Sequence, residues 1–313
     1  DDVVLRAAPR EAQLALPREL AHVEDRVAHE AVHDVALVHV DDQHRHKLLA
    51  EDLAHGDVTT EAVVSATQRG RARIMAREPL TVCGTQVAAH VFWSVDPDLS
   101  IELGAEDGDM VTPPIQVMLI SGSVQSILAA ERVALNFLQH LSSVATVTSA
   151  FCAAIAGTGA AVCDTRKTTP GLRALEKHAV RSGGGRSHRS TLADCTLIKD
   201  NHIASAGSIR IAIERARACA PHVARIEVEV ETPEQIVDAL DAGADVILLD
   251  NMPPDQVRSA IAKINGRAIT EASGSINIEN IRCYAEAGVD LISTSALTSM
   301  VRRVDLGLEL GID

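Results

Sequence analysis

An acidic chain that gathers positive charge around three consecutive glycines is the first feature with chemical meaning. The chain carries 29 Lys and Arg residues against 43 Asp and Glu residues, a formal net charge of −14 at pH 7. Between Asp164 and Lys199 the balance is reversed, with eight Lys or Arg residues against three Asp or Glu residues. A bound anion would explain this reversal, because Arg and Lys make strong charge-assisted contacts to carboxylates and phosphates. The stretch CDTRKTTPGLRALEKHAVRSGGGRSHR therefore predicts an anion-binding site.

Ionisable residues also stand at the ends of short aliphatic runs. Lys199 ends TLIK, Glu229 lies late in RIEVEVE, Asp250 ends VILLD and Glu271 ends AITE. In parallel α/β barrels the catalytic groups lie at the carboxyl ends of the strands. We therefore expect these side chains to meet at one mouth, where cations and anions neutralise each other or a ligand, because unpaired buried charges are costly.

The run RIEVEVE allows two interpretations. Strand alternation places Glu227, Glu229 and Glu231 on one face and aliphatic residues on the other. If the aliphatic face meets helices, the carboxylates point into the barrel. Alternatively, the run is an edge strand with a solvated acidic face.

Two small-residue turns point to phosphate. EASGSI, at residues 271–276, follows one expected strand, and we expect a helix to begin near Asn277. STSALT, at residues 293–298, repeats the arrangement after the last expected strand. Small residues let backbone N–H groups approach an anion at a helix N-terminus, and late barrel strands are the usual phosphate position.

The elements that must position these residues repeat regularly in the second half of the chain. Short β-branched or aliphatic runs alternate with helical patterns such as PEQIVDALDAGA and NIENIRCYAEAGV. This alternation predicts a parallel sheet, and we favour a closed or nearly closed barrel over a doubly wound sheet, since no Gly-x-Gly-x-x-Gly follows the first strand. The six runs are AAVCD, CTLIKD, RIEVEV, DVILLD, RAITEA and VDLISTS.

The first half reads differently. Mixed helix and strand patterns up to about Ser126 predict an α+β domain, and helical spacing from SILAAERVALNF onward predicts one or two helices that lead into the barrel. We expect an N-terminal extension of unclear role at residues 1–46, an α/β domain at 47–134 and a barrel at 135–298. The tail at 299–313 is expected to join the first domain.

Composition excludes several functions. An acidic balance and only five aromatic residues argue against nucleic-acid binding. No apolar run is long enough for a membrane helix, and the first residues lack the pattern of a secretory signal. Six widely spaced cysteines without a Cys-x-x-Cys pair predict free thiols, and we expect a cytoplasmic protein.

HEAVH at 29–33 and HRH at 44–46 have spacings that a metal could use, but without cysteines we interpret them as part of an uninformative extension.

The ordered motifs from Leu48 to the C-terminus resemble the quinolinate phosphoribosyltransferases. The resemblance implies an α/β fold, with an N-terminal α/β sandwich followed by an incomplete seven-stranded α/β barrel. It also implies transfer of the phosphoribosyl group of 5-phosphoribosyl 1-diphosphate (PRPP) to quinolinate, with release of diphosphate and CO2 and with Mg²⁺ as the cofactor. The motifs are EDLAHGDVTT, AREP, ERVALNFLQHLSSVAT, DTRKTTPGLRALEKHAVRSGGG, HR, LIKDNH, EVEVE, ILLDN, EASG and SALT.

Roles for individual residues follow from the same resemblance. Lys167, Glu229 and Asp250 are expected to be catalytic: Lys167 binds the diphosphate of PRPP, and the two acids bind ribose hydroxyls and water-ligated Mg²⁺. Arg173 and Lys177 are instead assigned from their spacing, four apart on an expected helix, to a solvated face or to a subunit contact. The residues expected to bind quinolinate are Arg132, which reaches the site of a second subunit in a homodimer, Arg166, His188, Arg189 and Lys199. The residues expected near the phosphates of PRPP are Ser273, Gly274, Ser275, Thr294 and Ser295.

Three serines depart from the family pattern. Ser187 stands where members usually have Asn, and Ser275 and Ser295 stand where glycine is frequent. Serine at a position with positive φ would add strain of about 1 kcal/mol.

Two alternative functions remain open. One is a phosphoribosyltransferase for nicotinate or another pyridine acid, and the other is a non-catalytic, anion-binding paralogue.

Overall fold

The structure, a computed structural model, describes residues 49–312. The extension expected at residues 1–46, with its histidine pairs, lies outside the described residues. None of the helices between residues 49 and 312 has the length and hydropathy of a membrane-spanning segment.

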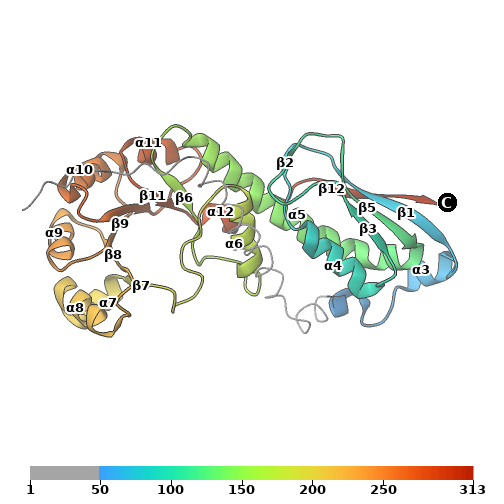
Figure 1. The fold of residues 1–313 in the computed structure, drawn as a ribbon, viewed down its shortest axis with the longest axis horizontal. Coiled ribbons are helices and arrows are strands. Elements are labelled where there is room, and N and C mark those ends of the chain that lie inside the picture. Colours follow the sequence, from blue (N-terminus) through green and yellow to red (C-terminus); the bar gives the residue numbers. More distant parts are fainter. Residues whose placement is uncertain (1–48, 313) are drawn as a thin grey trace, which may run out of the picture. The chain divides into compact units, whose positions relative to one another are not determined.

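An antiparallel sheet with helices beside it forms the first half of the fold (Figure 1). Its elements are α3 (Val58–Val63), β1 (Arg69–Ala76), β2 (Leu80–Thr81), α4 (Thr85–Val95), β3 (Ser100–Leu103), β4 (Met110–Val111), β5 (Ile115–Ser123), α5 (Val124–Ala154) and β12 (Leu306–Ile312). The main sheet has the order β12-β1-β5-β3, and β2 pairs separately with β4.

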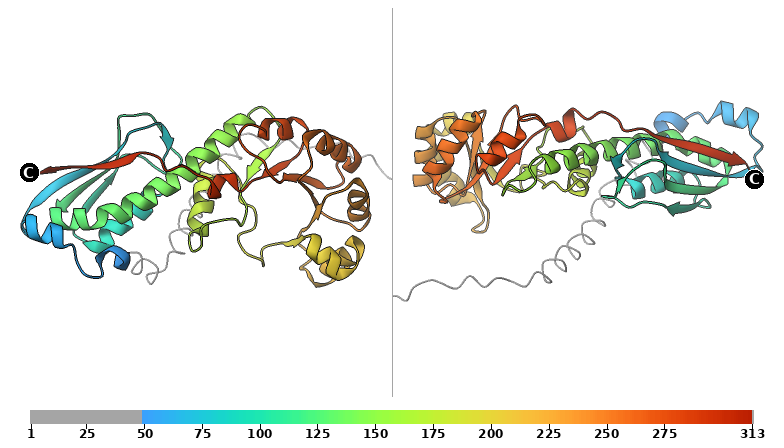
Figure 2. Two further views of the ribbon diagram at one scale, coloured as in Figure 1. Left: turned by 180° about the vertical axis from the view of Figure 1, so that it is seen from behind. Right: turned by 90° about the horizontal axis from the view of Figure 1, so that it is seen from above.

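Alternation in β1 explains why one face of this sheet is apolar. Ala72, Ile74 and Ala76 are buried, and the residues between them are exposed or half-buried. The buried side chains join a core that includes Phe92 of α4 and Leu138 of α5. β12 pairs antiparallel with β1, so the C-terminal residues return to the first sheet, as Figure 2 shows.

The second half is a parallel sheet flanked by helices. Its elements are β6 (Ala161–Cys163), α6 (Arg173–Ser182), β7 (Thr196–Ile198), α7 (Asp200–Ala206), α8 (Ile209–Cys219), β8 (Ile226–Val230), α9 (Pro233–Asp241), β9 (Val246–Asp250), α10 (Pro254–Ile264), β10 (Ile269–Ser273), α11 (Ile281–Glu286), β11 (Leu291–Ser293) and α12 (Ala296–Ser299). The strand order is β6-β11-β10-β9-β8-β7, so successive strands from β7 to β11 are neighbours and β6 pairs with β11. This is the order of an opened barrel, not of a doubly wound sheet, and it confirms the predicted fold class.

The seventh strand of the expected barrel is reduced to one bridge. Cys163 of β6 pairs in parallel with Arg186, and no further strand is assigned between β6 and β7 in the described chain. The interpretation of RIEVEVE as an edge strand is wrong, because β8 lies between β7 and β9.

One long helix, α5, connects the two halves. Its 31 residues run without interruption through the boundary that the sequence placed between residues 134 and 135. The glycines after α6 pack against this helix. A Cβ atom at Gly183 would lie 2.4 Å from the carbonyl oxygen of Ala145, and Gly184 has a φ of +87°. The triple glycine therefore serves close helix packing and a turn.

The helix expected near Asn277 begins later, at Ile281. The side chain of Asn277 accepts hydrogen bonds from the N–H groups of Glu279 and Asn280, both at 3.1 Å. This local turn replaces the first helical turn, since asparagine competes with helical hydrogen bonding in this way.

Candidate active site

A cavity of about 750 Å³ opens at the carboxyl ends of the parallel strands. Its volume lies within the range of small-molecule sites, roughly 300–1,000 Å³. Twelve of the thirteen residues that the sequence analysis selected line it: Arg166, Lys167, His188, Arg189, Lys199, Glu229, Asp250, Ser273, Gly274, Ser275, Thr294 and Ser295.

Arg132 is the exception. It lies on α5 with its side chain 64% exposed, and its nearest acid is Glu131 at 4.0 Å. It does not line the cavity of its own chain.

Four cations surround the cavity. Arg166 and Lys167 follow β6, Arg189 lies in the segment before β7, and Lys199 follows β7. Within the described residues, the buried Nε of Arg166 has no hydrogen-bond partner. The carbonyl oxygen of Lys167 accepts a hydrogen bond of 2.8 Å from the Thr298 hydroxyl, which fixes the backbone while the side chain stays exposed.

Two carboxylates face these cations from neighbouring strands. Glu229 of β8 forms an ion pair with Lys199, and Asp250 ends β9. Asn251, which the sequence analysis left without a role, donates a hydrogen bond of 2.6 Å to Asp250. Burial raises the pKa of Asp250, and repulsion from Glu229 adds to this. Two such acids with hard oxygen donors fit Mg²⁺, which binds through one or two carboxylates together with water and substrate phosphates.

A second acid cluster lies deeper in the same site. The Nε2 atom of His188 lies 3.1 Å from Glu227 and 3.7 Å from Glu271. The hydrogen bond to Glu227 raises the pKa of His188. Burial, with repulsion from Glu227, raises the pKa of Glu271 to about 7. One oxygen of each acid, both named Oε1, has no hydrogen-bond partner in the described part of the chain, so the cluster is short of donors.

The two small-residue turns differ in backbone geometry. Ser275 has a φ of 53°, so the strain expected of a serine at this position is confirmed. Ser295 has a φ of −78°, and no such strain arises there. Gly274 has a φ of +98°, and a Cβ atom on it would lie 2.2 Å from the side chain of Asn251.

The assignment of Lys177 to a solvated face or subunit contact is wrong. Lys177 is only 1% exposed and forms an ion pair with Asp164, which lies directly after β6. Arg173 is half-buried and donates hydrogen bonds to Thr168 at 3.0 Å and to the carbonyl oxygen of Ser190 at 3.1 Å.

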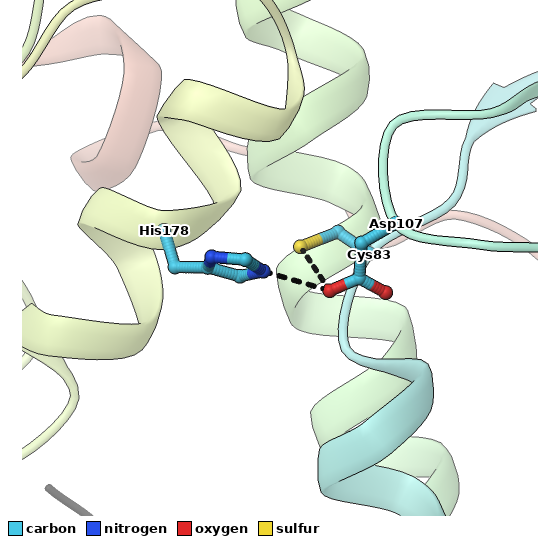
Figure 3. A group of neighbouring side chains, drawn as sticks. All are labelled: Cys83, Asp107 and His178. Atoms are coloured by element: carbon cyan, nitrogen blue, oxygen red, sulfur yellow. Dashed lines mark hydrogen bonds and ion pairs between the residues drawn. The ribbon is translucent and has the colours of Figure 1, made fainter. Parts of the chain in front are cut away.

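A separate polar cluster, which the sequence did not indicate, joins the first half of the fold to α6 (Figure 3). His178 donates a hydrogen bond of 2.8 Å to Oδ2 of Asp107, and the thiol of Cys83 lies 3.5 Å from the same oxygen. Burial acts to raise the pKa of Asp107, but the hydrogen bonds from His178 and the N–H groups of Gly84 and Thr85 outweigh it and lower this pKa to about 2. None of the three clustered residues lines the cavity.

Comparison with known proteins places the chain among enzymes of one kind. Residues 57–142 match the family model for the N-terminal domain of quinolinate phosphoribosyl transferase, and residues 144–309 match the model for its C-terminal domain. A probable nicotinate-nucleotide pyrophosphorylase (carboxylating) of Bacillus subtilis is 41% identical over 260 residues, which cover 83% of this chain and 90% of that protein. The nicotinate-nucleotide pyrophosphorylase (carboxylating) of Mycobacterium leprae is 42% identical over 271 residues, covering 84% and 95%. Among solved structures, NadC from Streptococcus pyogenes superposes with a TM-score of 0.84 at 40% identity, covering 87% of this chain and 96% of that one.

Proposed function

The chain belongs to the quinolinate phosphoribosyltransferase family, and from this premise we propose its reaction and the residues that perform it. The enzyme transfers the phosphoribosyl group of PRPP to quinolinate with decarboxylation, giving nicotinate mononucleotide, diphosphate and CO2 in the de novo synthesis of NAD. The observation that carries the proposal is a cavity with four cations on its wall and two carboxylates at adjacent strand ends. It suits two anionic substrates and a transition state with positive charge on the ribose.

Quinolinate has two adjacent carboxylates, which the cations hold. Arg166, Arg189 and Lys199 bind them, and His188 lines the same pocket. The unpartnered Nε of Arg166, counted over the described chain, supports this role, because a buried guanidinium N–H is costly to leave without an acceptor. Without substrate, Lys199 neutralises Glu229. When quinolinate binds, one of its carboxylates replaces Glu229 as the partner of Lys199, and Glu229 can then bind the ribose hydroxyls.

The carboxylates serve PRPP. Glu229 and Asp250 bind ribose hydroxyls and would hold Mg²⁺, which when bound would supply charge neutralisation of the diphosphate. Lys167 contacts the diphosphate, and its exposed side chain leaves it free to reach into the cavity. The turns with Ser273, Gly274 and Ser275 and with Thr294 and Ser295 bind the phosphate groups.

The chemistry follows from this placement. The pyridine nitrogen of quinolinate attacks the anomeric carbon of PRPP, and the bond to diphosphate breaks as positive charge develops on the ribose. Glu229 and Asp250 stabilise this charge electrostatically. The resulting pyridinium accepts the electron pair released when the 2-carboxylate leaves as CO2, and the ring carbon then takes a proton from water.

A homodimer completes the proposal. Arg132 reaches the site of a second subunit, which accounts for an arginine that is exposed and does not line the cavity of its own chain. All six cysteines are free, which supports placement in the reducing cytoplasm.

The test is an assay of the purified protein with PRPP and Mg²⁺. Quinolinate and nicotinate are offered separately, and nucleotide, diphosphate and CO2 are measured. Turnover with quinolinate and equimolar CO2 is the expected result. Turnover with nicotinate without CO2 would favour the other pyridine transferase, and folded protein that is inactive with both would favour the non-catalytic paralogue.

A further inference from the structure

A buried ion pair lies directly behind His188. Asp164 is fully buried after β6, and Lys177 on α6 is 1% exposed. Oδ1 of Asp164 accepts a hydrogen bond from Nζ of Lys177. Burial raises the pKa of Asp164, and the hydrogen bond and charge of Lys177 oppose this rise, so the acid depends on the lysine to remain ionised.

The same two side chains bind the backbone of His188 from both sides. Oδ1 of Asp164 accepts a hydrogen bond of 2.8 Å from the N–H of His188. Nζ of Lys177 donates a hydrogen bond of 2.9 Å to the carbonyl oxygen of His188. Both polar backbone groups of this one residue are therefore satisfied by a single ion pair.

Secondary structure cannot provide this restraint. Residues 187–195, between the bridge at Arg186 and the start of β7, belong to no helix or strand. The ring of His188 is fixed at both nitrogens: Nδ1 accepts a hydrogen bond of 2.7 Å from the N–H of Arg189, and Nε2 lies 3.1 Å from Glu227. The ring can keep these contacts only while its backbone stays in place. Arg189 follows directly and lines the cavity.

We propose that Asp164 and Lys177 are positioning residues, whose ion pair fixes the backbone of His188 and thereby aims His188 and Arg189 at the carboxylates of quinolinate. This inference rests on the proposed function, because it assigns quinolinate to that wall of the cavity. It assigns a role in substrate recognition to two residues that do not line the cavity. A displacement of about 1 Å in such a group can reduce activity by roughly 100-fold.

The neighbouring residue on α6 provides a matched control. His178 also makes a buried ion pair, with Asp107 at 2.8 Å, but it faces the first half of the fold and does not line the cavity (Figure 3). Replacing either Lys177 or His178 breaks a buried pair on the same helix. Within residues 49–312, the hydrogen bonds to the backbone of His188 come from the Lys177 pair.

The experiment compares Lys177→Met with His178→Gln in the full chain. We expect Lys177→Met to raise the KM and the calorimetric Kd for quinolinate by about 10- to 100-fold, with the KM for PRPP changed by less than about twofold. His178→Gln should lower thermal stability and leave both constants within about twofold of the parent. A second variant, Asp164→Asn with Lys177→Met, removes the unpaired acid and keeps the test valid where Lys177→Met alone does not fold. The double variant should be more stable than Lys177→Met alone. Its binding of quinolinate should remain as weak, since the carbonyl of His188 still lacks its donor.

A readout without catalysis separates this inference from the proposed function. Hydrogen–deuterium exchange should become faster in residues 187–195 of the Lys177 variants and stay unchanged there in His178→Gln. If the parent turns over quinolinate but the Lys177 variants bind it normally and exchange normally, the inference is overturned while the function stands. If the parent does not use quinolinate, the proposed function is wrong, and unaltered exchange at 187–195 would overturn the positioning role as well.

Discussion

Histidine meets a buried carboxylate in two regions of this molecule, with opposite consequences. In the cluster between the first half of the fold and α6, Asp107 lies 2.8 Å from His178, and its pKa is lowered to about 2. In the cavity, Glu271 lies 3.7 Å from His188, and burial and Glu227 raise its pKa to about 7. A carboxyl group beside an imidazole therefore favours the ionised acid in one place and the protonated acid in the other.

The supply of hydrogen-bond donors, together with the charge of the second acid Glu227 beside Glu271, explains the difference. Besides its contact with His178, Asp107 accepts at Oδ1 hydrogen bonds from the N–H of Gly84 at 2.9 Å, the N–H of Thr85 at 3.0 Å and the Thr85 hydroxyl at 2.8 Å. Glu227 and Glu271 instead share one imidazole, with Ser293 also donating to Glu271, and each acid keeps an oxygen without a partner among the described residues. A satisfied cluster stabilises the fold, whereas the cavity keeps unfavourable charge that a ligand can relieve, which is typical of functional sites.

Replacing Asp250 by Ala should give the largest effect and should reduce activity without loss of stability. We expect kcat to fall by about 100- to 1,000-fold, as for the loss of one group that stabilises transition-state charge. Stability should not fall, because burial and Glu229 already disfavour the ionised acid. Steady-state kinetics and urea unfolding measure the two effects. Asp255→Ala, at a side chain that is 97% exposed on α10, is the matched control, and normal turnover of Asp250→Ala would contradict its role.

Replacing Glu271 by Gln should stabilise the protein at high pH. The folded pKa of Glu271, about 7, lies above its ordinary value of 4.5, so the folded state binds more protons between these values and stability falls as pH rises through this window. The variant lacks this penalty, so at about pH 8 its free energy of unfolding should exceed that of the parent by up to about 3 kcal/mol. Near pH 4 the difference should vanish. Urea unfolding at both pH values tests this, and an equal difference at both would show that the effect is not ionisation.

Replacing Asp107 by Asn should lower the free energy of unfolding at neutral pH, the opposite of the effect expected for Glu271→Gln. Its folded pKa, about 2, lies below its ordinary value of 3.8, so its stabilising contribution is present above pH 3.8 and is lost as pH falls toward 2. We expect the variant to lose roughly 2 kcal/mol of unfolding free energy at pH 7, with a smaller difference from the parent below about pH 4. Turnover at saturating substrate should stay unchanged. A fall in kcat of the folded variant would mean that this cluster also serves the cavity.

Features set by residues that are adjacent in the chain could be predicted from the sequence, whereas features set by contacts between distant elements could not. The six strands and the charges at their ends were predictable, because an aliphatic run and the residue that ends it are adjacent in the chain. The buried state of Lys177 was not, since its spacing from Arg173 is that of a solvated helix face and its partner Asp164 belongs to another element. Cys83, Asp107 and His178 likewise come together only through packing of the first half against α6.

Details of the backbone also divide into those that the sequence could predict and those that it could not. The late start of α11 depends on the side chain of Asn277, which is a local signal. The sequence analysis missed it because the small-residue turn before Asn277 suggested that the helix begins there. The reduction of the seventh strand to the Cys163–Arg186 bridge left no signal in the chain. The two unusual serines, 275 and 295, looked equivalent in sequence, and only their φ angles separate them.

Replacing Ser275 by Gly should have the smallest effect. At a φ of 53° serine has a steric penalty that glycine lacks, so Ser275→Gly should gain about 0.5–1 kcal/mol of unfolding free energy, less the entropy that glycine adds to the unfolded chain. Ser295→Gly is the matched control on the neighbouring turn. Its φ of −78° is ordinary, so the same replacement should lose about 0.5–1 kcal/mol. Opposite signs in urea unfolding are the expected result. Destabilisation by both would mean that the hydroxyl of Ser275 stabilises the turn by more than the strain costs, and a rise in the KM for PRPP in Ser275→Gly alone would then assign that hydroxyl to the phosphate.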